Sequence, residues 1–465
     1  MSVHDEKDTR AIARTPEFEE LRSRVAADIK RLKIPGVALG VWSGGREEIA
    51  VFGRTSVENP LPVTPDTLFQ IGSITKTMTT TALLRLVEMG RLDLDAPIRG
   101  LLSGFSMADP DVAARLTTRH LLTHTGGWAG DYFNDFGNGD DALARMVESI
   151  GHLPQVTALG AYFSYNNAGF NIASRVLEVL YGKPYEDAMR ELIFEPLGLS
   201  MSFFYPSDIL ITHRFVAGHQ KWGATVKVAR PWAIGRAGNG VGGAVLSIRD
   251  LLAYARFHLR SGMNDKGERV MGAATVESMR TPSFDAGARG WVGLSWFIKN
   301  IGGLAAVGHG GATKGQESYL CLVPEKDFAV ALLTNSGSGG IITDKLRGWA
   351  LDIWFGAKAS EPVPVPASDA DIAERIGFYD QPLSAYRLER WHGGLRVQNE
   401  PRGGFPKPDT PPGPPDPPSR AALLAGDRLL LLDEPSKGSI GEFIRDSEGR
   451  IVFLRLGGRI HKKLS

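Results

Sequence analysis

Apolar and polar positions follow helical and strand periods in a definite order along the first 355 residues. Thr15-Pro16 opens a helical pattern that continues to residue 32, with the threonine as N-cap and the proline at the first helical position. Two strand-like runs follow at 36–43 and 47–53. They are joined at Gly44-Gly45, which is a hairpin signal.

A long helix is predicted from near Ser73, with one face made of apolar residues: Met78, Ala82, Leu86 and Met89. Residues 90–290 are mostly helix-like segments and loops. Strand patterns return at 304–310, 317–323 and 328–335, and a last helix over 342–355 has its apolar side made of Ile342, Leu346, Trp349 and Ile353. This order predicts an α+β fold, in which distant chain segments complete one sheet beside a helical domain.

A Pro-rich run near residue 360 predicts a domain boundary. We expect an N-terminal tail over 1–15, a main domain over 16–358, a linker over 359–369 and a small β domain over 370–465. Short strand-like segments in the last part favour an antiparallel sheet or barrel. The proline-rich loop at 401–420 inside it is expected to stay extended.

Composition narrows the possible partners. The chain has 465 residues, of which 53 are basic and 52 acidic, so no overall charge attracts it to nucleic acid or to a membrane surface. It contains no apolar run long enough for a membrane-spanning helix and no apolar leader at its N-terminus, which predicts a cytoplasmic protein. The single cysteine, Cys321, lies in a strand-like run and is expected to be a buried apolar residue.

The first candidate for chemistry is Ser73-Ile74-Thr75-Lys76. On a helix, positions i and i+3 share a face, so the Lys76 amine can reach the Ser73 hydroxyl. A serine needs an adjacent base to become a nucleophile, and a lysine whose pKa is lowered by burial can serve. A capping serine beside a solvated lysine is the simpler interpretation of the motif alone. The apolar residues around it favour burial, and a buried lysine needs a function.

A tyrosine near a lysine can pass a proton to a leaving group, and a nearby amide can orient a substrate. Two Tyr-x-Asn sequences occur, Tyr132 with Asn134 and Tyr165 with Asn167. Only the second precedes an amphipathic helix that would support it rigidly. We therefore select Tyr165 and Asn167, although a buried tyrosine beside a capping asparagine is common.

Three glycine-containing runs compete as a strand edge that a substrate could approach closely. They begin at His124, His309 and His392. Only His309-Gly310-Gly311 lies between strand patterns of the main sheet, whereas His392 suggests a hairpin in the small domain and His124 a loop after a helix.

Other catalytic motifs are missing from the sequence. It has no G-x-S-x-G, no H-E-x-x-H and no P-loop. Its remaining histidines are scattered, so no metal site is expected.

The order and spacing of Ser73-x-x-Lys76, Tyr165-x-Asn167 and His309-Gly310-Gly311 resemble the serine β-lactamase and penicillin-binding-protein superfamily. The resemblance covers about residues 20–355. It is strongest to the class C β-lactamase-like branch, which includes family VIII esterases, D-aminopeptidases and related amide hydrolases. The C-terminal part is similar, more faintly, to the lipocalin-like domain of some members.

This resemblance implies a fold of an antiparallel five-stranded sheet flanked by helices, beside an all-helical domain. It implies that Ser73 forms an acyl-enzyme, that Lys76 and Tyr165 share the proton transfers, and that Asn167 orients the substrate. The backbone N–H groups of Ser73 and Ala312 would form the oxyanion hole. The resemblance implies no cofactor.

One departure from the family bears on the substrate. Penicillin-directed members usually carry lysine at the position of His309, where it helps bind a carboxylate. A histidine is only partly charged at neutral pH, which favours small esters, amides or peptides without that carboxylate. A D-amino-acid peptidase, a weak β-lactamase and a non-catalytic binding protein remain alternatives, and a homo-oligomer is compatible with the sequence.

Overall fold

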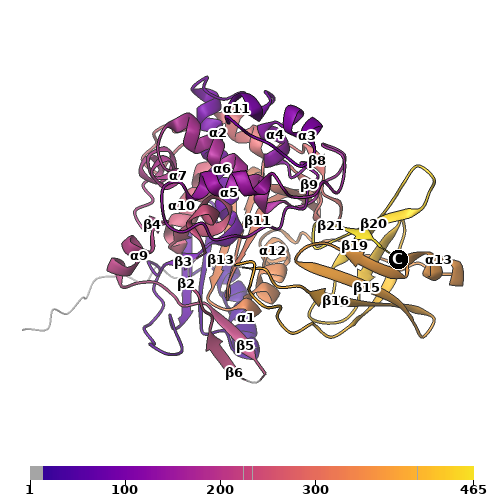
Figure 1. The fold of residues 1–465 in the computed structure, drawn as a ribbon. Coiled ribbons are helices and arrows are strands. Elements are labelled where there is room, and N and C mark those ends of the chain that lie inside the picture. The colour runs from indigo at the N-terminus through magenta and orange to yellow at the C-terminus, as the bar shows by residue number, and fades with distance from the viewer. Residues whose placement is uncertain (1–13, 224, 233, 406, 465) are drawn as a thin grey trace, which may run out of the picture.

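The computed structural model describes residues 14–223, 225–232, 234–405 and 407–464. A sheet-and-helix body lies beside a closed β-barrel formed by the C-terminal residues (Figure 1). The tail expected over residues 1–15 lies, up to residue 13, outside the described residues.

The central sheet is antiparallel and contains eight strands rather than the expected five. In spatial order they are β2 (Arg46–Gly53), β1 (Gly36–Ser43), β13 (Phe328–Thr334), β12 (Gln316–Val323), β11 (Leu304–Thr313), β10 (Phe297–Ile301), β9 (Trp291–Val292) and β8 (Phe284–Asp285). The last three extend one edge, and two of them are too short to give an alternating pattern. Strand β1 pairs with β13, so the two ends of the main domain meet in the middle of the sheet.

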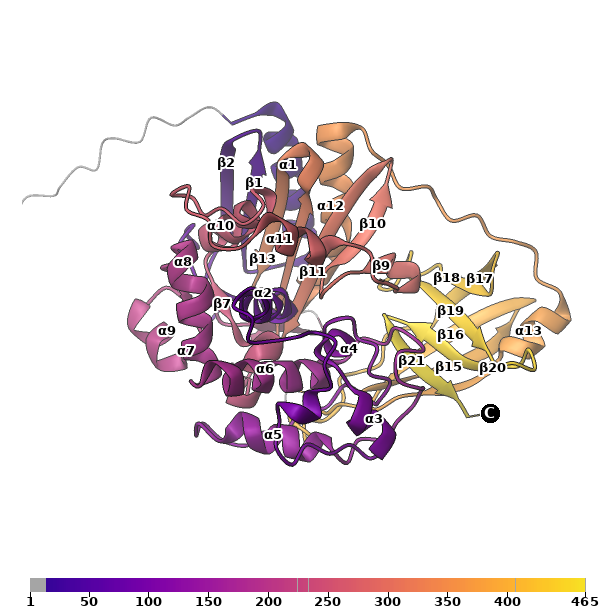
Figure 2. The ribbon, with the colours of Figure 1, turned by 90° about the horizontal axis from the view of Figure 1, so that it is seen from above.

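The two faces of the sheet are covered by different helices. Helices α1 (Pro16–Leu32) and α12 (Gly340–Phe355) pack side by side on one face (Figure 2). In β1, Val37 and Leu39 face these helices, while Ala38 faces the larger core on the other side. Alternate side chains of β1 therefore pack into two different apolar layers, one on each face of the sheet, as expected for an internal strand.

The helical part follows β2 in the chain. Its helices are α2 (Thr75–Glu88), α3 (Pro110–Arg115), α4 (Thr118–Leu122), α5 (Ala142–Ile150), α6 (Asn167–Tyr181), α7 (Tyr185–Met189), α8 (Glu195–Leu197), α9 (Pro206–Thr212), α10 (Ile248–Leu259) and α11 (Ala273–Arg280). In the part of the chain that the structure describes, no helix is long and apolar enough to span a membrane.

Helix α2 passes through the centre of this body (Figure 2). Met78, Ala82 and Leu86 are fully buried, as predicted. The prediction for Met89 is wrong: it lies one residue beyond the helix end and is 48% exposed. Several buried threonines of α2 are tolerated because their hydroxyls find partners, as in the bonds of Thr79 to the Thr75 carbonyl and to Tyr185.

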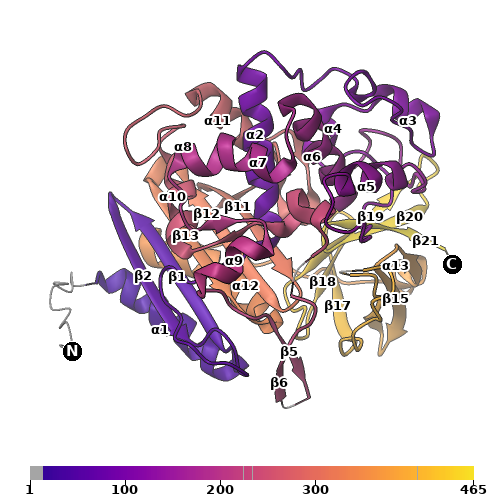
Figure 3. The ribbon, with the colours of Figure 1, turned by 60° about the vertical axis from the view of Figure 1, so that its left-hand side comes forward.

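Two small sheets complete the body. One contains β3 (Phe69–Gln70), β7 (Val245–Leu246) and β4 (Ser202–Phe203). The other is the hairpin of β5 (His219–Trp222) and β6 (Thr225–Val228), which projects from the molecule (Figure 3). Strand β3 leads directly into the turn that carries Ser73. The position of this strand in the small sheet therefore fixes the position of Ser73.

The C-terminal residues form a closed antiparallel barrel, in agreement with the expected small β domain. Its strands are β14 (Gly377–Asp380), β15 (Ser384–Trp391), β16 (Gly394–Pro401), β17 (Ser419–Leu424), β18 (Arg428–Leu431), β19 (Ile440–Arg445), β20 (Ile451–Leu456) and β21 (Arg459–Lys463). Helix α13 (Asp369–Arg375) packs Ile372 into the barrel core.

The proline-rich loop between β16 and β17 contacts the main domain. Phe405 packs edge-to-face on Phe133 at 4.8 Å between ring centroids, and Lys407 forms a 2.6 Å ion pair with Asp135. The barrel is therefore attached to the loop that also contains Asp131, a residue of the site described below.

Candidate active site

Ser73 and Lys76 meet as the sequence predicts. Ser73 lies in a 3₁₀ turn, Gly72–Ile74, directly before α2, and Lys76 lies in the first turn of that helix. The Lys76 amine is 3.0 Å from the Ser73 hydroxyl oxygen and donates to the Val241 carbonyl at 2.7 Å. These two contacts hold the amine beside the Ser73 hydroxyl.

The Lys76 side chain is completely buried. Burial lowers its pKa well below the ordinary value, and the positive charge of Arg459 lowers it further, while the carboxylate of Asp131 acts in the opposite direction. A lysine of this kind is deprotonated far more readily than a surface lysine and can accept a proton from Ser73.

Two glycines bring the Ser73 turn against the end of β11. Gly72 has a φ of +51°, and a Cβ added there would lie 2.6 Å from the Ala312 nitrogen. A Cβ at Gly311 would lie 1.9 Å from the Ile71 carbonyl oxygen. The backbones of Ser73 and Ala312 can approach only because side chains are missing here, which suits a pair of N–H groups serving one oxyanion.

Tyr165 lies beside Ser73 and Lys76. The Lys76 amine lies 5.1 Å from the centre of its ring, and its hydroxyl is hydrogen-bonded with Ser73. Burial raises the pKa of Tyr165 to about 12, although the bond with Ser73 lowers it. At neutral pH Tyr165 is therefore a phenol, and Lys76 is the better proton acceptor.

Contacts of neighbouring residues fix the position of the Tyr165 ring. The next residue, Asn166, caps α6 by accepting from the Gly169 N–H. His124, which the sequence placed only in a loop, stacks on the Tyr165 ring at 4.3 Å between centroids, and its Nδ1 accepts from the Asn166 N–H at 3.0 Å. His124 is thus a positioning residue for Tyr165. The sequence feature that could have indicated this role is the run His124-Thr125-Gly126.

The Asn167 side chain is hydrogen-bonded to one member of an ion pair. Its side-chain nitrogen donates to Asp131 at 2.6 Å, and Asp131 forms an ion pair with Arg459, whose Nη2 is 3.1 Å from Oδ1. Arg459 lies on β21, and its guanidinium carbon is 5.1 Å from the Tyr165 ring centre. The barrel therefore places a cation beside Tyr165.

The turn between β20 and β21 supplies further contacts. The Gly458 carbonyl accepts from the Tyr165 backbone N–H at 2.9 Å, and the Gly457 carbonyl accepts from Arg289 at the same distance. The Ile460 N–H donates to the Ser164 hydroxyl at 3.2 Å. These contacts make the barrel turn part of the site.

His309 also lies beside Tyr165, at 6.1 Å between ring centroids. Burial and the neighbouring Lys76 lower its pKa to about 3, so it is neutral at pH 7. Its Nδ1 lies 2.6 Å from the Gly310 carbonyl oxygen, which can only accept, so Nδ1 carries the proton. Its Nε2 is buried and has no partner among the described residues.

Two of the competing motifs, those of Tyr132 and His392, lie outside this cluster. Asn134 donates to the Tyr132 hydroxyl at 3.2 Å, and within the described ranges neither residue is hydrogen-bonded to Ser73 or Lys76. His392 lies in the β15–β16 hairpin, as expected. Cys321 is buried in β12, and burial raises the pKa of its thiol to about 12.

Metal ligands do not cluster in this site. Among the residues that the structure describes, no group of three or more histidine, cysteine, aspartate or glutamate side chains could hold a metal ion.

Comparison with known families gives one match that spans most of the body. A family model described as Beta-lactamase matches residues 21–347. Penicillin-binding protein 4 of Amycolatopsis lactamdurans is 34% identical over 358 residues, covering 75% of this chain and 93% of that protein. The unguisins hydrolase ungD' of Aspergillus campestris is 25% identical over 335 residues, covering 69% of this chain and 62% of that protein.

Solved structures extend the likeness to the barrel. The crystal structure of SurE with D-Leu covers 96% of this chain and 99% of its own, at 25% identity and a TM-score of 0.74. The D-amino acid amidase of Ochrobactrum anthropi SV3, complexed with L-phenylalanine amide, covers 73% of this chain and 98% of its own, at 23% identity and a TM-score of 0.61. At 23% identity, this comparison shows that the amidase and this chain have the same fold.

Proposed function

Because the chain belongs to the β-lactamase family, we propose that it is a serine hydrolase that acts through an acyl-enzyme on small esters or amides. One observation carries the proposal. The buried Lys76 amine lies 3.0 Å from the Ser73 hydroxyl oxygen, in surroundings that lower its pKa. That arrangement places beside the serine an amine that loses its proton more readily than a surface lysine and can then accept the serine proton.

Acylation begins with transfer of the Ser73 proton to the Lys76 amine. The serine oxygen attacks the substrate carbonyl carbon, and the negative charge on the carbonyl oxygen is stabilised by the N–H groups of Ser73 and Ala312. As the tetrahedral intermediate collapses, the bond to the leaving group breaks. The Tyr165 phenol protonates the leaving group and recovers a proton from the Lys76 ammonium.

Deacylation reverses these roles with water as the nucleophile. Water loses a proton to the Tyr165–Lys76 pair and attacks the acyl carbon. The bond to the Ser73 oxygen then breaks, the carboxylic acid product leaves, and the serine regains its proton. The unpartnered Nε2 of His309 is available to accept a hydrogen bond from the water or the leaving group.

A D-amino-acid-specific peptidase or a weak β-lactamase is the second candidate. The similarity to SurE, solved with D-Leu, and to a D-amino acid amidase favours it. The same Ser73, Lys76 and Tyr165 would perform the reaction, so the two candidates differ only in what the rest of the site accepts. Retention of these side chains in one hydrogen-bonded cluster speaks against a non-catalytic binding protein.

One panel of substrates tests the proposal. We would assay p-nitrophenyl esters, D- and L-amino-acid p-nitroanilides and nitrocefin with a single preparation, using Ser73→Ala as the control. We expect hydrolysis of at least the esters by the wild-type protein alone. Equal rates in the wild type and Ser73→Ala for every compound would refute it. Hydrolysis confined to D-amino-acid anilides or nitrocefin would select the second candidate.

A further inference from the structure

A cavity of about 520 Å³ lies between the main domain and the barrel, within the size range of small-molecule sites. His309 and Gly310 of the catalytic strand line one part of it, and the β20–β21 turn lines another. A molecule in this cavity therefore lies against the same strand as the reacting carbonyl group.

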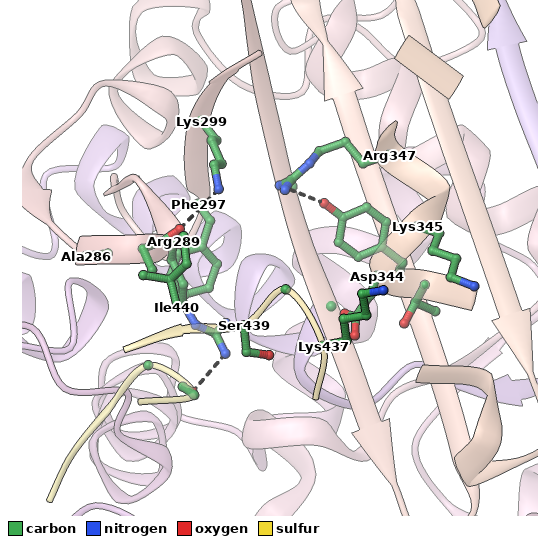
Figure 4. Close-up of a pocket in the computed structure, with 18 of the residues that line it drawn as sticks. Ala286, Arg289, Phe297, Lys299, Asp344, Lys345, Arg347, Lys437, Ser439 and Ile440 are labelled. Atoms are coloured by element: carbon green, nitrogen blue, oxygen red, sulfur yellow. Dashed lines mark hydrogen bonds between the residues drawn. The ribbon is translucent and has the colours of Figure 1, made fainter. Parts of the chain in front are cut away.

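Arg289 lines this cavity beside Phe297 (Figure 4). Its guanidinium carbon is 5.1 Å from the centre of the Phe297 ring and 6.0 Å from that of Tyr165. It donates to the Gly457 carbonyl oxygen, and the side chain is exposed to the cavity. One backbone contact and two aromatic faces thus hold a cation in a fixed place.

No carboxylate neutralises this cation. Within the described ranges, no ion pair of 4.0 Å or less involves Arg289. Most of its N–H donors are therefore available, and a guanidinium fits a carboxylate with two parallel hydrogen bonds.

The rest of the wall also favours an anion. Six cationic and three anionic side chains line the cavity. Among the described residues, Lys299 and Arg347 are hydrogen-bonded to uncharged oxygens, of Ala288 and Tyr319. Asp344 is the carboxylate of this wall whose charge acts on Arg289.

We propose that this cavity binds a carboxylate carried by the substrate and that Arg289 is the residue that recognises it. The inference rests on the proposed hydrolase and names its substrate class. Neutral His309 cannot supply the positive charge that lysine gives in penicillin-directed relatives. Arg289 supplies it from the β8–β9 segment instead, so the carboxylate lies on the barrel side of the catalytic strand.

The carboxylate can belong to the acyl group or to the leaving group, and two substrate pairs distinguish these sources. The first pair is mono-p-nitrophenyl glutarate and its methyl ester. The second pair is 3-acetoxybenzoate and 3-acetoxybenzamide. In one of the pairs we expect the wild type to prefer the anion roughly tenfold or more in kcat/KM, mainly through KM, as for a charge-assisted contact.

Three variants test the role of Arg289. In Arg289→Gln the preference should fall towards one, because the glutamine amide can keep the bond to Gly457 but carries no charge. Arg289→Lys should restore part of the preference. Lys437→Gln removes another cation of the cavity wall and should change the preference less than about twofold. Equal preference in Arg289→Gln and the wild type would overturn the inference.

Binding separates this inference from the proposed function. The same pairs would be titrated calorimetrically into Ser73→Ala, with and without Arg289→Gln. Tighter binding of an anion that depends on Arg289 and weakens with salt supports the carboxylate site even if turnover fails. Equal binding of anion and neutral partner in both pairs overturns it, even if the wild type hydrolyses the neutral esters.

Discussion

The site has two parts that are built in opposite ways. Ser73 and Lys76 are neighbours on one helical turn, and the amine reaches the hydroxyl through local geometry alone. Arg459 reaches Asp131 across 328 positions of sequence, and only docking of the barrel brings them together. The first part supplies the nucleophile and base, whereas the second sets the charge around them and the cavity for the substrate.

This difference predicts how substitutions will behave. Changes in the local part should remove chemistry, while changes in the barrel part should alter pH dependence and substrate preference. Each of the substitutions below tests whether the two parts of the site have these separate roles.

Lys76→Met should lower kcat/KM for ester hydrolysis by roughly two to four decades, the usual scale for a lost general base. The methionine fills the same buried space without an amine, so folding should be retained and can be checked by circular dichroism. Lys326→Met, on the exposed turn after β12, is the matched control. A well-folded Lys76→Met with near-normal turnover would remove Lys76 from the mechanism.

Tyr165→Phe should lower turnover by roughly two decades, because it removes the hydroxyl that passes the proton and keeps the ring. Tyr132→Phe makes the same change in the competing Tyr-x-Asn sequence and should leave turnover within about twofold. If Tyr132→Phe were the damaging change, the assignment of the tyrosine would be wrong.

Arg459→Gln should move the acid limb of the kcat/KM profile to higher pH. The reaction needs neutral Lys76, and the positive charge of Arg459 lowers the pKa of Lys76, so its removal raises that pKa. Asp131 acts in the opposite direction, and the double variant Asp131→Asn/Arg459→Gln should return the limb part of the way. An unchanged limb in Arg459→Gln would mean that the barrel does not tune the base.

Gly458→Ala should lower kcat several-fold because it disturbs the barrel turn that contacts Tyr165 and Arg289. Gly458 has a φ of +79°, and a Cβ there would lie 2.4 Å from the Arg289 Nε. Gly449→Ala, in the β19–β20 turn, has a φ of +81° and open space around its Cβ. Both variants should lose about 1 kcal/mol of unfolding free energy, measured by urea denaturation. Equal kcat values in the two variants would show that the β20–β21 turn does not influence catalysis.

The sequence predicted what local periodicity determines. The spacing of Ser73 and Lys76, the support of Tyr165 by α6 and the burial of the α2 face all follow from positions a few residues apart. The helical pattern alone could not locate the end of α2, which is why Met89 was placed on the wrong side of the boundary. Two-residue strands such as β8 and β9 give no period to detect, so eight strands were not foreseen.

The remote part of the site could not be predicted in the same way. Arg459 lies in a short polar strand, and Asp131 in a glycine-containing loop, and neither has a distinctive spacing. The expectation for His309 treated it as the only candidate for carboxylate recognition. The fold adds Arg289, whose role depends on β8, β9 and the barrel turn meeting beside Tyr165.

Covalent labelling of Ser73 tests the account most directly. The wild type and Ser73→Ala would be incubated with a fluorophosphonate, and the adduct would be located by intact-protein mass spectrometry and peptide mapping. The account predicts one adduct on Ser73 in the wild type and none in Ser73→Ala. An unlabelled wild type, or an adduct that persists in Ser73→Ala, would contradict the claim that Ser73 is the nucleophile.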